Sequence, residues 1–456
     1  MTTTQKPHIT SAAPGPTVND VLSAEPGTPK VLLEEHCPDI GLADLPRERY
    51  YSREQHELEV ERMWRKVWQM ACRVDDIPDV GDTCVYDIAE DSIVVVRVSE
   101  TEIKAYYNTC LHRGTALRAG DGNVPALRCP MHGWKWNLDG SLADLPCAWD
   151  FPHVDKSKLS LNEVLVDTWD GWVFVNLDPD AGPLRDYLED IPEHFDQLGL
   201  PDRYKAVHVA GRVPCNWKTA LEAFIEGWHS WVSHPQLISI FADVSTQNDI
   251  YGRHISRFIT LVGVPSLMST EPRDAQHIVD VFIRDLLQAD PAGVEVPEGM
   301  SAREFLSEML RGQLGQLTGR DHSELSNAEV LDAVEYLVFP NFTPWPGFGL
   351  PIVYRYRPDG ANPESCIVDI MLLAEVPAEG PRPRNAPTTW ISGEDWTEAP
   401  ELGSLGTVFN QDRTNITRMQ RGLKTGPKRT VTLSSYQEVR IRHHAQTLDS
   451  YLEVSP

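Results

Sequence analysis

Two short Cys–His pairs are the first residues in this sequence whose types and spacing suggest chemistry. Cys110-Leu-His112 comes first, and Cys129-Pro-Met-His132 follows after sixteen residues. Two thiolates and two imidazoles suit either a tetrahedral zinc ion or a [2Fe–2S] centre in which two His replace two Cys on one iron. Zinc sites usually group Cys with Cys and His with His. Each pair here contributes one of each, so the alternation favours the iron–sulfur centre, with zinc as the alternative.

A second group of candidate metal ligands lies about a hundred residues further on, in Glu226-Gly-Trp-His229-Ser-Trp-Val-Ser-His234-Pro235. His229 and His234 are five residues apart, so on a regular helix their side chains would point about 140° away from each other. Pro235 disfavours helical backbone at the residue before it. We therefore expect the helix to end near Ser233 and His234 to fold back beside His229. Two imidazoles and one carboxylate would then form the facial triad of a non-haem Fe(II) site with positions open for O₂.

The chain offers two acids as the third ligand of this triad. Glu226 stands three residues before His229 and would share its helix face, which suits it better to hydrogen-bond an imidazole than to bind the same metal. Asp412 is our choice, because it lies near the start of a helix predicted over 407–421, where the helix dipole favours an ionised carboxylate. The alternative for Asp412 is an ordinary N-cap or first-turn aspartate.

Together these segments resemble the α subunit of Rieske non-haem iron oxygenases, the ring-hydroxylating family. Asn108-Thr-Cys110-Leu-His112-Arg-Gly114 with Cys129-Pro-Met-His132-Gly-Trp134 is close to the Rieske signature, and the likeness runs from about residue 45 to the C-terminus. The resemblance implies these ligands of a [2Fe–2S] cluster: Cys110, His112, Cys129 and His132. It implies these ligands of Fe(II): His229, His234 and Asp412. It also implies that Glu226 is an inter-subunit electron relay from His132 of the partner subunit to His229.

The same resemblance implies the terminal component of an oxygenase. Such a protein takes electrons from a ferredoxin or reductase and uses O₂ to hydroxylate its substrate. It would form a homotrimer in which the cluster of one subunit serves the iron of the next, and a β subunit is possible in this family. Alternatives are a monooxygenase that demethylates or hydroxylates a non-aromatic substrate, and a non-catalytic Rieske electron carrier. The long chain after the Rieske segment argues against the carrier.

Two further patterns concern the substrate and the electron donor. Aromatic residues gather around the iron helix and the later β runs, which predicts a hydrophobic, aromatic or polycyclic substrate. These residues are Phe224, Trp228, Trp231, Phe241, Phe258, Phe339, Phe342, Trp345 and Phe348. Arg113, Arg118 and Lys135 flank the cluster loops and would form a basic patch for the donor.

Composition excludes several classes of protein. The chain has 456 residues with 41 basic and 67 acidic side chains, a formal net charge of −26. This charge would repel nucleic acid and anionic membranes. No run approaches the ~18 apolar residues of a membrane helix, and the first residues lack the apolar stretch of a secretory signal. Eight Cys are too few for a disulfide scaffold. We therefore expect a soluble, cytoplasmic protein.

Hydrophobic periodicity predicts an α+β chain in three parts. They are an N-terminal arm (1–45), a small antiparallel β Rieske domain with a leading helix over 52–68 (46–178), and a catalytic domain (179–456). For the last, the resemblance implies a helix-grip fold of antiparallel sheet plus helices. Its predicted helices are 184–198, 217–233, 273–289, 302–318, 326–337, 407–421 and 435–453. Its predicted strands are 205–213, 252–263, 350–356 and 365–376. We interpret 273–337 as a lid or as peripheral packing, the six other Cys as buried, and His443 and His444 as facing solvent.

Overall fold

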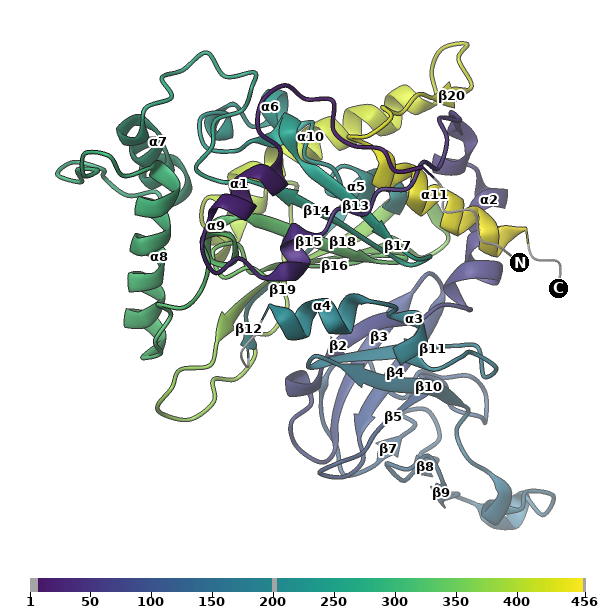
Figure 1. Ribbon diagram of the computed structural model, residues 1–456. Coiled ribbons are helices and arrows are strands. Elements are labelled where there is room, and N and C mark those ends of the chain that lie inside the picture. The colour runs from purple at the N-terminus through teal and green to yellow at the C-terminus, as the bar shows by residue number, and fades with distance from the viewer. Residues whose placement is uncertain (1–6, 199–202, 454–456) are drawn as a thin grey trace. The chain divides into compact units, whose positions relative to one another are not determined.

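The computed structural model describes residues 7–198 and 203–453. The predicted arm (1–45) and the predicted catalytic domain (179–456) therefore include a few positions, 1–6, 199–202 and 454–456, that lie outside the described residues. The chain divides into two compact units, shown in Figure 1. The small unit comprises residues 57–187 and 359–361, and the large unit comprises residues up to 56, 188–358 and 362–456.

The small unit is built from antiparallel strands, as the short β runs predict. Its seven-stranded sheet has the order β2-β11-β10-β5-β4-β3-β6, and a three-stranded sheet has the order β7-β8-β9. The bounds of the first sheet are β2 Gln69–Arg73, β3 Asp82–Ile88, β4 Asp91–Arg97, β5 Ile103–Tyr107, β6 Gly122–Asn123, β10 Glu163–Trp169 and β11 Trp172–Asn176. Those of the second are β7 Leu127–Arg128, β8 Lys135–Trp136 and β9 Leu142–Asp144. Asp170 and Gly171 both have positive φ, as a tight hairpin turn between β10 and β11 requires.

Short helices occur near both ends of the segment 57–187 in the sequence. The predicted leading helix is present as α2 (Arg53–Glu59), which continues as a π-turn over Val60–Trp64 and ends there instead of at residue 68. The predicted helix over 184–198 is broken into α3 (Leu184–Tyr187) and α4 (Ile191–Gln197), the second of which belongs to the large unit. Glu189 adopts a φ of 50° between them, a left-handed conformation that a continuous helix does not allow.

The large unit is centred on an eight-stranded sheet of order β13-β14-β15-β16-β17-β18-β12-β19. Its strands are β12 Arg203–Val213, β13 Gln247–Tyr251, β14 Ile255–Thr260, β15 Ala333–Val338, β16 Phe342–Pro344, β17 Ile352–Asp359, β18 Asn362–Glu375 and β19 Thr389–Trp390. A separate two-stranded pair joins β1 (Leu45–Pro46) to β20 (Thr430–Val431). The prediction of a helix over 326–337 was wrong for its second half. Ala333–Val338 is the fully buried strand β15 between two other strands, where sheet pairing and burial prevail over helical spacing.

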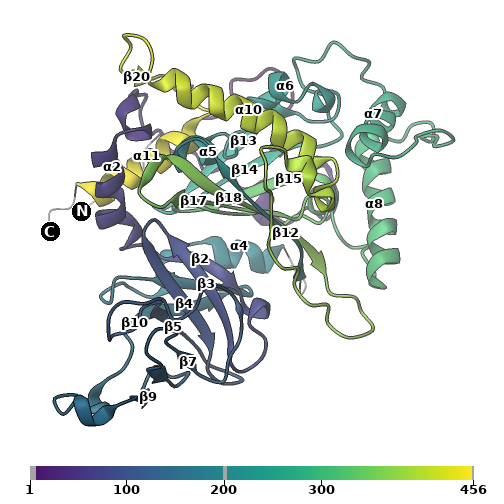
Figure 2. The same ribbon diagram turned by 180° about the vertical axis from the view of Figure 1, so that it is seen from behind.

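Several helices of the large unit pack around this sheet. Figures 1 and 2 show α5, α10 and α11 on the same side of the sheet, and α7 and α8 beside its end. Their bounds are α5 Trp217–Glu222, α6 Ser230–Ser233, α7 Ala275–Val281, α8 Ala302–Thr318, α9 Asn327–Leu331, α10 Leu405–Leu423 and α11 Val439–Leu452. Buried side chains of α7, α8 and α9 form one hydrophobic cluster with Phe258 of β14, so each of these helices contributes one face to the packed core. Among the described residues no helix combines the length and apolar character that a bilayer crossing needs.

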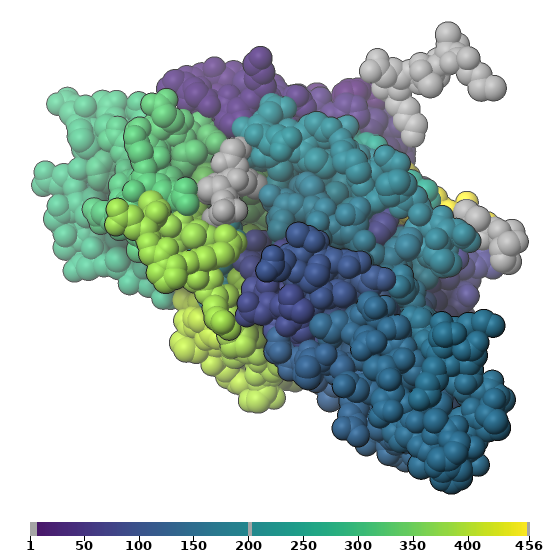
Figure 3. Space-filling view, turned by 90° about the horizontal axis from the view of Figure 1, so that it is seen from below, coloured from purple at the N-terminus to yellow at the C-terminus, as the bar shows by residue number. Residues whose placement is uncertain are grey.

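The predicted N-terminal arm packs along the large unit, where Figure 3 shows it in purple beside the green segment. It contains one short helix, α1 (Val18–Ala24). Leu22, Val31 and Leu32 of the arm are fully buried. Arg303 of α8 donates to Glu25 at 2.7 Å. The arm is therefore part of the folded large unit although it has no periodic pattern of its own.

Candidate metal centres

The two Cys–His loops of the small unit have the same backbone conformation. The N–H of Cys110 donates to Thr115 O at 2.9 Å, and the N–H of Cys129 donates to Trp134 O at 2.8 Å. Gly114 donates back to Cys110 O, and Gly133 does so to Cys129 O. Each glycine stands four residues after its cysteine with a φ of 80° or 78°, a conformation that favours glycine.

These loops bring the four predicted ligands together in two pairs. The imidazole rings of His112 and His132 have centroids 4.6 Å apart. Cys110 and Cys129 are both 2% exposed, and their thiols interact directly. The four donor atoms do not all lie within 4.8 Å of one another, a condition that only another group of the described residues meets. Four ligands of a single zinc ion at 2.0–2.3 Å would meet this condition. Sulfur beside sulfur and nitrogen beside nitrogen instead suits a centre of two irons.

Buried polar atoms in these loops also fit an iron–sulfur cluster. Nδ1 of His112 is buried without a hydrogen-bond partner in the described part of the chain, and an iron ligand needs no other partner. The buried indole N–H of Trp136 has no partner of ordinary length either, and it approaches Cys110. Burial raises the pKa of the Cys110 thiol, whereas this indole N–H lowers it. Hydrogen bonds to cluster sulfurs are one determinant of reduction potential.

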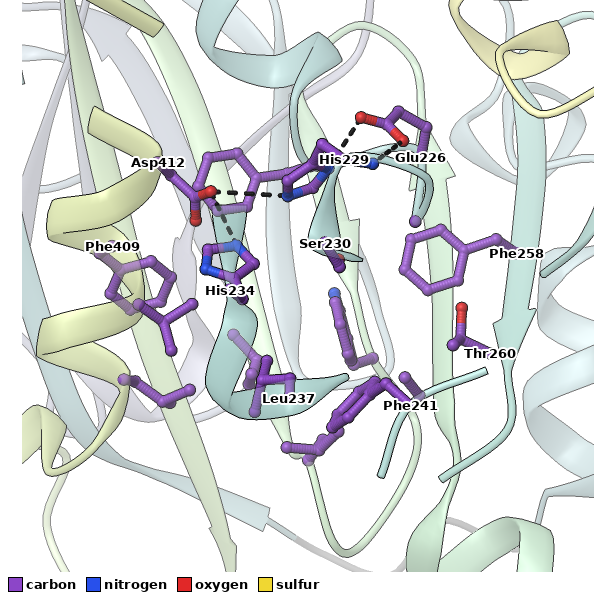
Figure 4. A pocket seen from close by; sticks show the side chains of 18 of the residues that line it. Glu226, His229, Ser230, His234, Leu237, Phe241, Phe258, Thr260, Phe409 and Asp412 are labelled. Atoms are coloured by element: carbon purple, nitrogen blue, oxygen red, sulfur yellow. Dashed lines mark hydrogen bonds and ion pairs between the residues drawn. The ribbon is translucent and has the colours of Figure 1, made fainter. Parts of the chain in front are cut away.

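The large unit brings His229, His234 and Asp412 together. Oδ1 of Asp412 lies 2.9 Å from Nε2 of His234 and 3.5 Å from Nε2 of His229. One donor atom from each of the three residues lies within 4.8 Å of the others, and no other residues in the described chain meet this criterion. Figure 4 shows the three side chains converging from α10 and from the segment around α6. The expected end of the helix before Pro235 is confirmed, since α6 ends at Ser233.

The opposite ring nitrogens of the two histidines are held by oxygen acceptors. Nδ1 of His229 donates to Glu226 Oε1 at 2.7 Å, and Nδ1 of His234 donates to Gln411 Oε1 at 2.8 Å. When both rings are neutral with the proton on Nδ1, the lone pairs of both Nε2 atoms point towards the Asp412 carboxylate. A cation between them would remove the repulsion of these lone pairs, so the donor set fits a bound Fe(II).

Charges around the triad shift its pKa values strongly. Burial lowers the pKa of His229, but the charge of Glu226 and the hydrogen bond to Asp412 outweigh it and hold this pKa well above the ordinary value. For Asp412 burial raises the pKa, and the hydrogen bonds from His229 and His234 bring it below the ordinary value. Both shifts arise because carboxylates face the imidazoles, so the site favours a positive charge there, from a proton or from a metal ion.

The physical reasons that we gave for the two acids were wrong, although both acids contact the histidines. Helix α10 begins at Leu405, so Asp412 lies in its third turn and is neither an N-cap nor a first-turn residue. The predicted helix over 217–233 breaks after Glu222, and Glu226 lies in the irregular turn before α6. Its Oε2 accepts the N–H of His229 at 3.0 Å. Glu226 thus meets His229 by closing a turn.

Sequence reasoning missed Gln411 and misplaced several other residues. Gln411 has no signal beyond its position next to Asp412. Cys147 is exposed, unlike the other five thiols outside the motif. His443 and His444 are buried, and Nε2 of His444 contacts Pro340 O at 3.0 Å, because α11 packs into the large unit on that face. Arg118 donates to Thr83 Oγ1 at 3.1 Å, which leaves Arg113 and Lys135 as the exposed members of the predicted basic patch.

An apolar cavity of about 110 Å³ adjoins the triad. Figure 4 shows side chains around it, including Phe241, Phe258 and Phe409. Its aromatic lining consists of Phe224, Phe241, Phe258, Trp345, Tyr354 and Phe409. Four of these are among the nine aromatic residues that the sequence gathers around the iron helix and the later β runs; of the others, Trp228 is exposed, and Phe339, Phe342 and Phe348 are buried in the core. No Lys or Arg is among the described residues that line the cavity.

A second cavity of about 460 Å³ borders two of the three candidate iron ligands, His229 and Asp412. It shares Glu226, His229 and Asp412 with the apolar cavity, and its lining adds the carboxylates of Glu222 and Glu438. The hydroxyl of Tyr50 donates to Glu222 Oε2 at 2.9 Å. The triad therefore lies between an apolar cavity and an acidic one.

Comparisons with known proteins agree with this geometry. The family model for the ring hydroxylating alpha subunit (catalytic domain) matches residues 187–454, and the model for the Rieske [2Fe-2S] domain matches residues 67–155. The chain belongs to the ring-hydroxylating α subunits, members of the Rieske non-haem iron oxygenases. The predicted family, fold class and cofactors are confirmed: its Rieske domain binds a [2Fe–2S] cluster, and its catalytic domain uses non-haem Fe(II).

Relatives within this family oxidise different kinds of substrate. The oxygenase subunit of carnitine monooxygenase from Escherichia coli (strain K12) is 31% identical over 215 residues, which is 45% of this chain and 56% of the relative. Biphenyl dioxygenase subunit alpha from Paraburkholderia xenovorans (strain LB400) is 30% identical over 236 residues, 49% of this chain and 51% of the relative. The chain thus spans about half the length of the curated relatives it matches.

Solved structures share the fold over most of the chain. A quaternary ammonium Rieske monooxygenase in complex with L-carnitine has a TM-score of 0.63 at 19% identity, covering 92% of this chain and 100% of that one. Naphthalene 1,2-dioxygenase with indole bound has a TM-score of 0.63 at 16% identity, covering 91% of this chain and 94% of that one. At these identities the likeness establishes the fold alone.

Proposed function

We propose that this chain is the terminal component of an oxygenase that hydroxylates an uncharged, hydrophobic substrate, aromatic or polycyclic in class. The observation that carries this proposal is the apolar cavity that adjoins His229, His234 and Asp412. A hydrophobic molecule in this cavity would lie next to the iron site. Its aromatic lining offers flat surfaces for stacking and edge contacts.

The residues that would hold the cofactors follow from the two sites. In this proposal the cluster is bound by Cys110, His112, Cys129 and His132, and Fe(II) by His229, His234 and Asp412. When bound, the cluster supplies single electrons, and Fe(II) activates O₂. The protein around the iron site fixes both imidazoles, because Glu226 and Gln411 each hold one Nδ1 proton and leave Nε2 for the metal.

Glu226 is our proposed relay between His132 of the partner subunit and His229. Two observations support it. Its carboxylate contacts His229 Nδ1 at 2.7 Å, and the residue lines both cavities beside the triad, including the acidic one. This role goes with the homotrimer that the family resemblance implies, and a sedimentation measurement that finds only the 51.3 kDa monomer would contradict the trimer.

The electron donor in this proposal is a ferredoxin or reductase that docks on Arg113 and Lys135. Both side chains are exposed beside the cluster loops of a chain with a net charge of −26. An acidic donor would find local attraction there. Exchanging both residues for Glu should slow reduction of the cluster, most strongly at low salt. Rates that stay unchanged would remove this docking site.

The charge of the cavity lining separates the two substrate classes found among the relatives. Carnitine and glycine betaine each carry a carboxylate. That carboxylate would meet no Lys or Arg in the described lining of this cavity, which already contains Glu226 and Asp412. An uncharged substrate has no such penalty. The second candidate is nevertheless a quaternary ammonium compound, because aromatic rings bind such cations and the carnitine and glycine betaine monooxygenases are relatives.

A substrate panel with isotopically labelled O₂ tests the proposal. The purified, iron-loaded protein would be supplied with a surrogate ferredoxin and reductase and offered naphthalene, biphenyl, indole, choline, carnitine and glycine betaine. We expect mass spectrometry to find the label in products of the uncharged aromatic compounds. Labelled products from the quaternary ammonium compounds alone would favour the second candidate. No labelled product from an enlarged panel, with both metals present, would contradict the proposed function.

A further inference from the structure

The turn that carries Glu226 is held in place by a buried arginine of the last helix. Arg440 of α11 is 0% exposed. Its Nη1 donates to Ile225 O at 3.0 Å, immediately before Glu226 in the chain. The backbone at this point has left the helical pattern of α5, and a buried carbonyl outside a helix needs a donor from elsewhere. Arg440 supplies that donor.

The same guanidinium is fixed to the wall of the apolar cavity. Its Nε donates to Ser256 Oγ at 3.1 Å, and its Nη2 donates to Glu335 Oε1 at 3.1 Å. Ser256 is two residues before Phe258 on β14, and Phe258 pairs directly with Glu335 on β15. The guanidinium carbon lies 5.1 Å from the centroid of the Phe258 ring, which lines the cavity.

Arg440 therefore joins two parts of the site that lie on separate segments. One is the cavity wall on β14 and β15, which the sheet makes rigid. The other is the irregular turn over 223–229, which no helix or strand stabilises. A planar guanidinium holds its N–H donors in fixed directions towards three acceptors. An ammonium also has three donors, but they rotate about a single nitrogen. Glu335 is itself 0% exposed and supplies the opposite charge that a buried arginine requires.

We propose that Arg440 is a positioning residue, which fixes the turn over 223–229 to the cavity wall and so keeps Glu226 Oε1 on Nδ1 of His229. The proposal deepens the proposed function, on which its kinetic consequence rests. Without the link, the turn would move relative to the sheet. Glu226 would then contact His229 for only part of the time, whereas His229, His234 and Asp412 would all still be present to bind iron.

Two neighbouring arginines on one helix provide the test. Arg440→Met with Glu335→Gln removes both buried charges and keeps similar side-chain volumes, so that no lone charge stays buried. Arg442→Met is the matched control, because Arg442 is also buried, at 1% exposed, but donates to Leu433 O and Ser434 O on another loop. Arg440→Lys is the third variant, since it keeps the charge and loses the planar geometry.

Hydrogen exchange of the iron-loaded protein gives a readout that does not depend on turnover. The amide of His229 donates to Glu226 Oε2 at 3.0 Å and so reports on the turn directly. In the double variant we expect amides of 223–229 to exchange at least about tenfold faster, with the sheet strands unchanged. Arg442→Met should leave the turn as in the wild type. Arg440→Lys should lie between these two, and it decides the matter if the double variant does not fold.

Kinetics provide the second readout. If the wild type oxygenates a substrate, kcat of the double variant should fall roughly tenfold with little change in KM. Unchanged exchange over 223–229 in a folded Arg440 variant would overturn the proposal. The exchange could be faster in the variant while the wild type oxygenates no substrate. That result would support the role of Arg440 in holding the turn and would count against the proposed function alone.

Discussion

The two metal centres of this chain are built in opposite ways. The four proposed cluster ligands lie between residues 110 and 132, on two loops with matching backbone hydrogen bonds. The proposed iron triad combines residues 229 and 234 with residue 412, on an irregular segment and a distant helix. A site of the first kind depends on local turn chemistry, whereas a site of the second kind depends on the packing of the whole unit.

The two sites also differ in which ring nitrogen of their histidines has a hydrogen-bond partner in the protein. Nδ1 of His112 is buried without a partner in the described chain, so this nitrogen is the one that faces the cluster site. In the triad Nδ1 of His229 and of His234 is held by protein oxygens, and Nε2 faces Asp412. In this interpretation His112 presents Nδ1 to the cluster site, whereas the triad histidines present Nε2 to theirs. Variants that change one centre should accordingly leave the other intact.

Removing Asp412 should have the largest effect. In Asp412→Ala the two imidazoles lose the only carboxylate that faces both Nε2 atoms among the described residues. We expect loss of the mononuclear iron and no detectable product, with the visible spectrum of the cluster unchanged. Iron analysis and absorption spectra test this. If the variant kept its mononuclear iron, the ligand assignment would be wrong.

Glu226→Gln should separate iron binding from electron delivery. The amide keeps a similar shape but loses the charge that raises the pKa of His229, after burial has lowered it. Both metals should stay bound, and product formation should fall about 10–100-fold. Glu222→Gln, in the same acidic cavity without contact to His229, is the matched control. Turnover at the wild-type rate in Glu226→Gln would rule out the relay.

Trp136→Phe should affect the small unit alone. The indole N–H that approaches Cys110 would be lost, while the buried aromatic ring would be kept. Because a donor to a cluster sulfur favours the reduced state, the reduction potential should fall. A tenfold change in the reduction equilibrium corresponds to about 59 mV for one electron. Spectroelectrochemistry measures it, with Trp134→Phe as the control. An unchanged potential in Trp136→Phe would show that this N–H does not reach the cluster.

Glu222 should produce the smallest effect, visible only in the pH dependence of stability. Burial raises its pKa from 4.5 to about 7. The folded protein then binds more protons than the unfolded chain between these values, so stability falls as pH rises through this window. Relative to Glu222→Gln, the wild type should lose up to about 3 kcal/mol of unfolding free energy between pH 4.5 and pH 7.5. Denaturant titrations at several pH values measure this difference. If the unfolding free energies of the wild type and Glu222→Gln changed in parallel with pH, the raised pKa of Glu222 would be contradicted.

Sequence alone predicted the parts of this structure that have local causes. Ser301 and Glu304 form a capping box, and the helix predicted over 302–318 has those bounds. Pro235 ends the helix before it, and this gave the arrangement of His229 and His234 correctly. The Cys–His loops could be predicted for the same reason, because the Cys, His and Gly of each loop lie within five residues of one another in the sequence.

Other parts depend on long-range packing that no local pattern records. Residues 333–338 have helical spacing but become a strand because two neighbours pair with them. Asp412 was found through the family resemblance, and its supposed place at a helix start was wrong. Gln411 and Arg440 had no signal, since their roles come from partners 177 and 215 residues away in the sequence.

Iron and acid-labile sulfide analysis of the purified protein, with electron paramagnetic resonance of the reduced state, tests the central claim most directly. Two separate centres in one chain predict about three irons and about two sulfides per chain, with the signal of a His-ligated cluster. Two irons with two sulfides in a protein that takes up no further iron, or zinc in place of both, would contradict it.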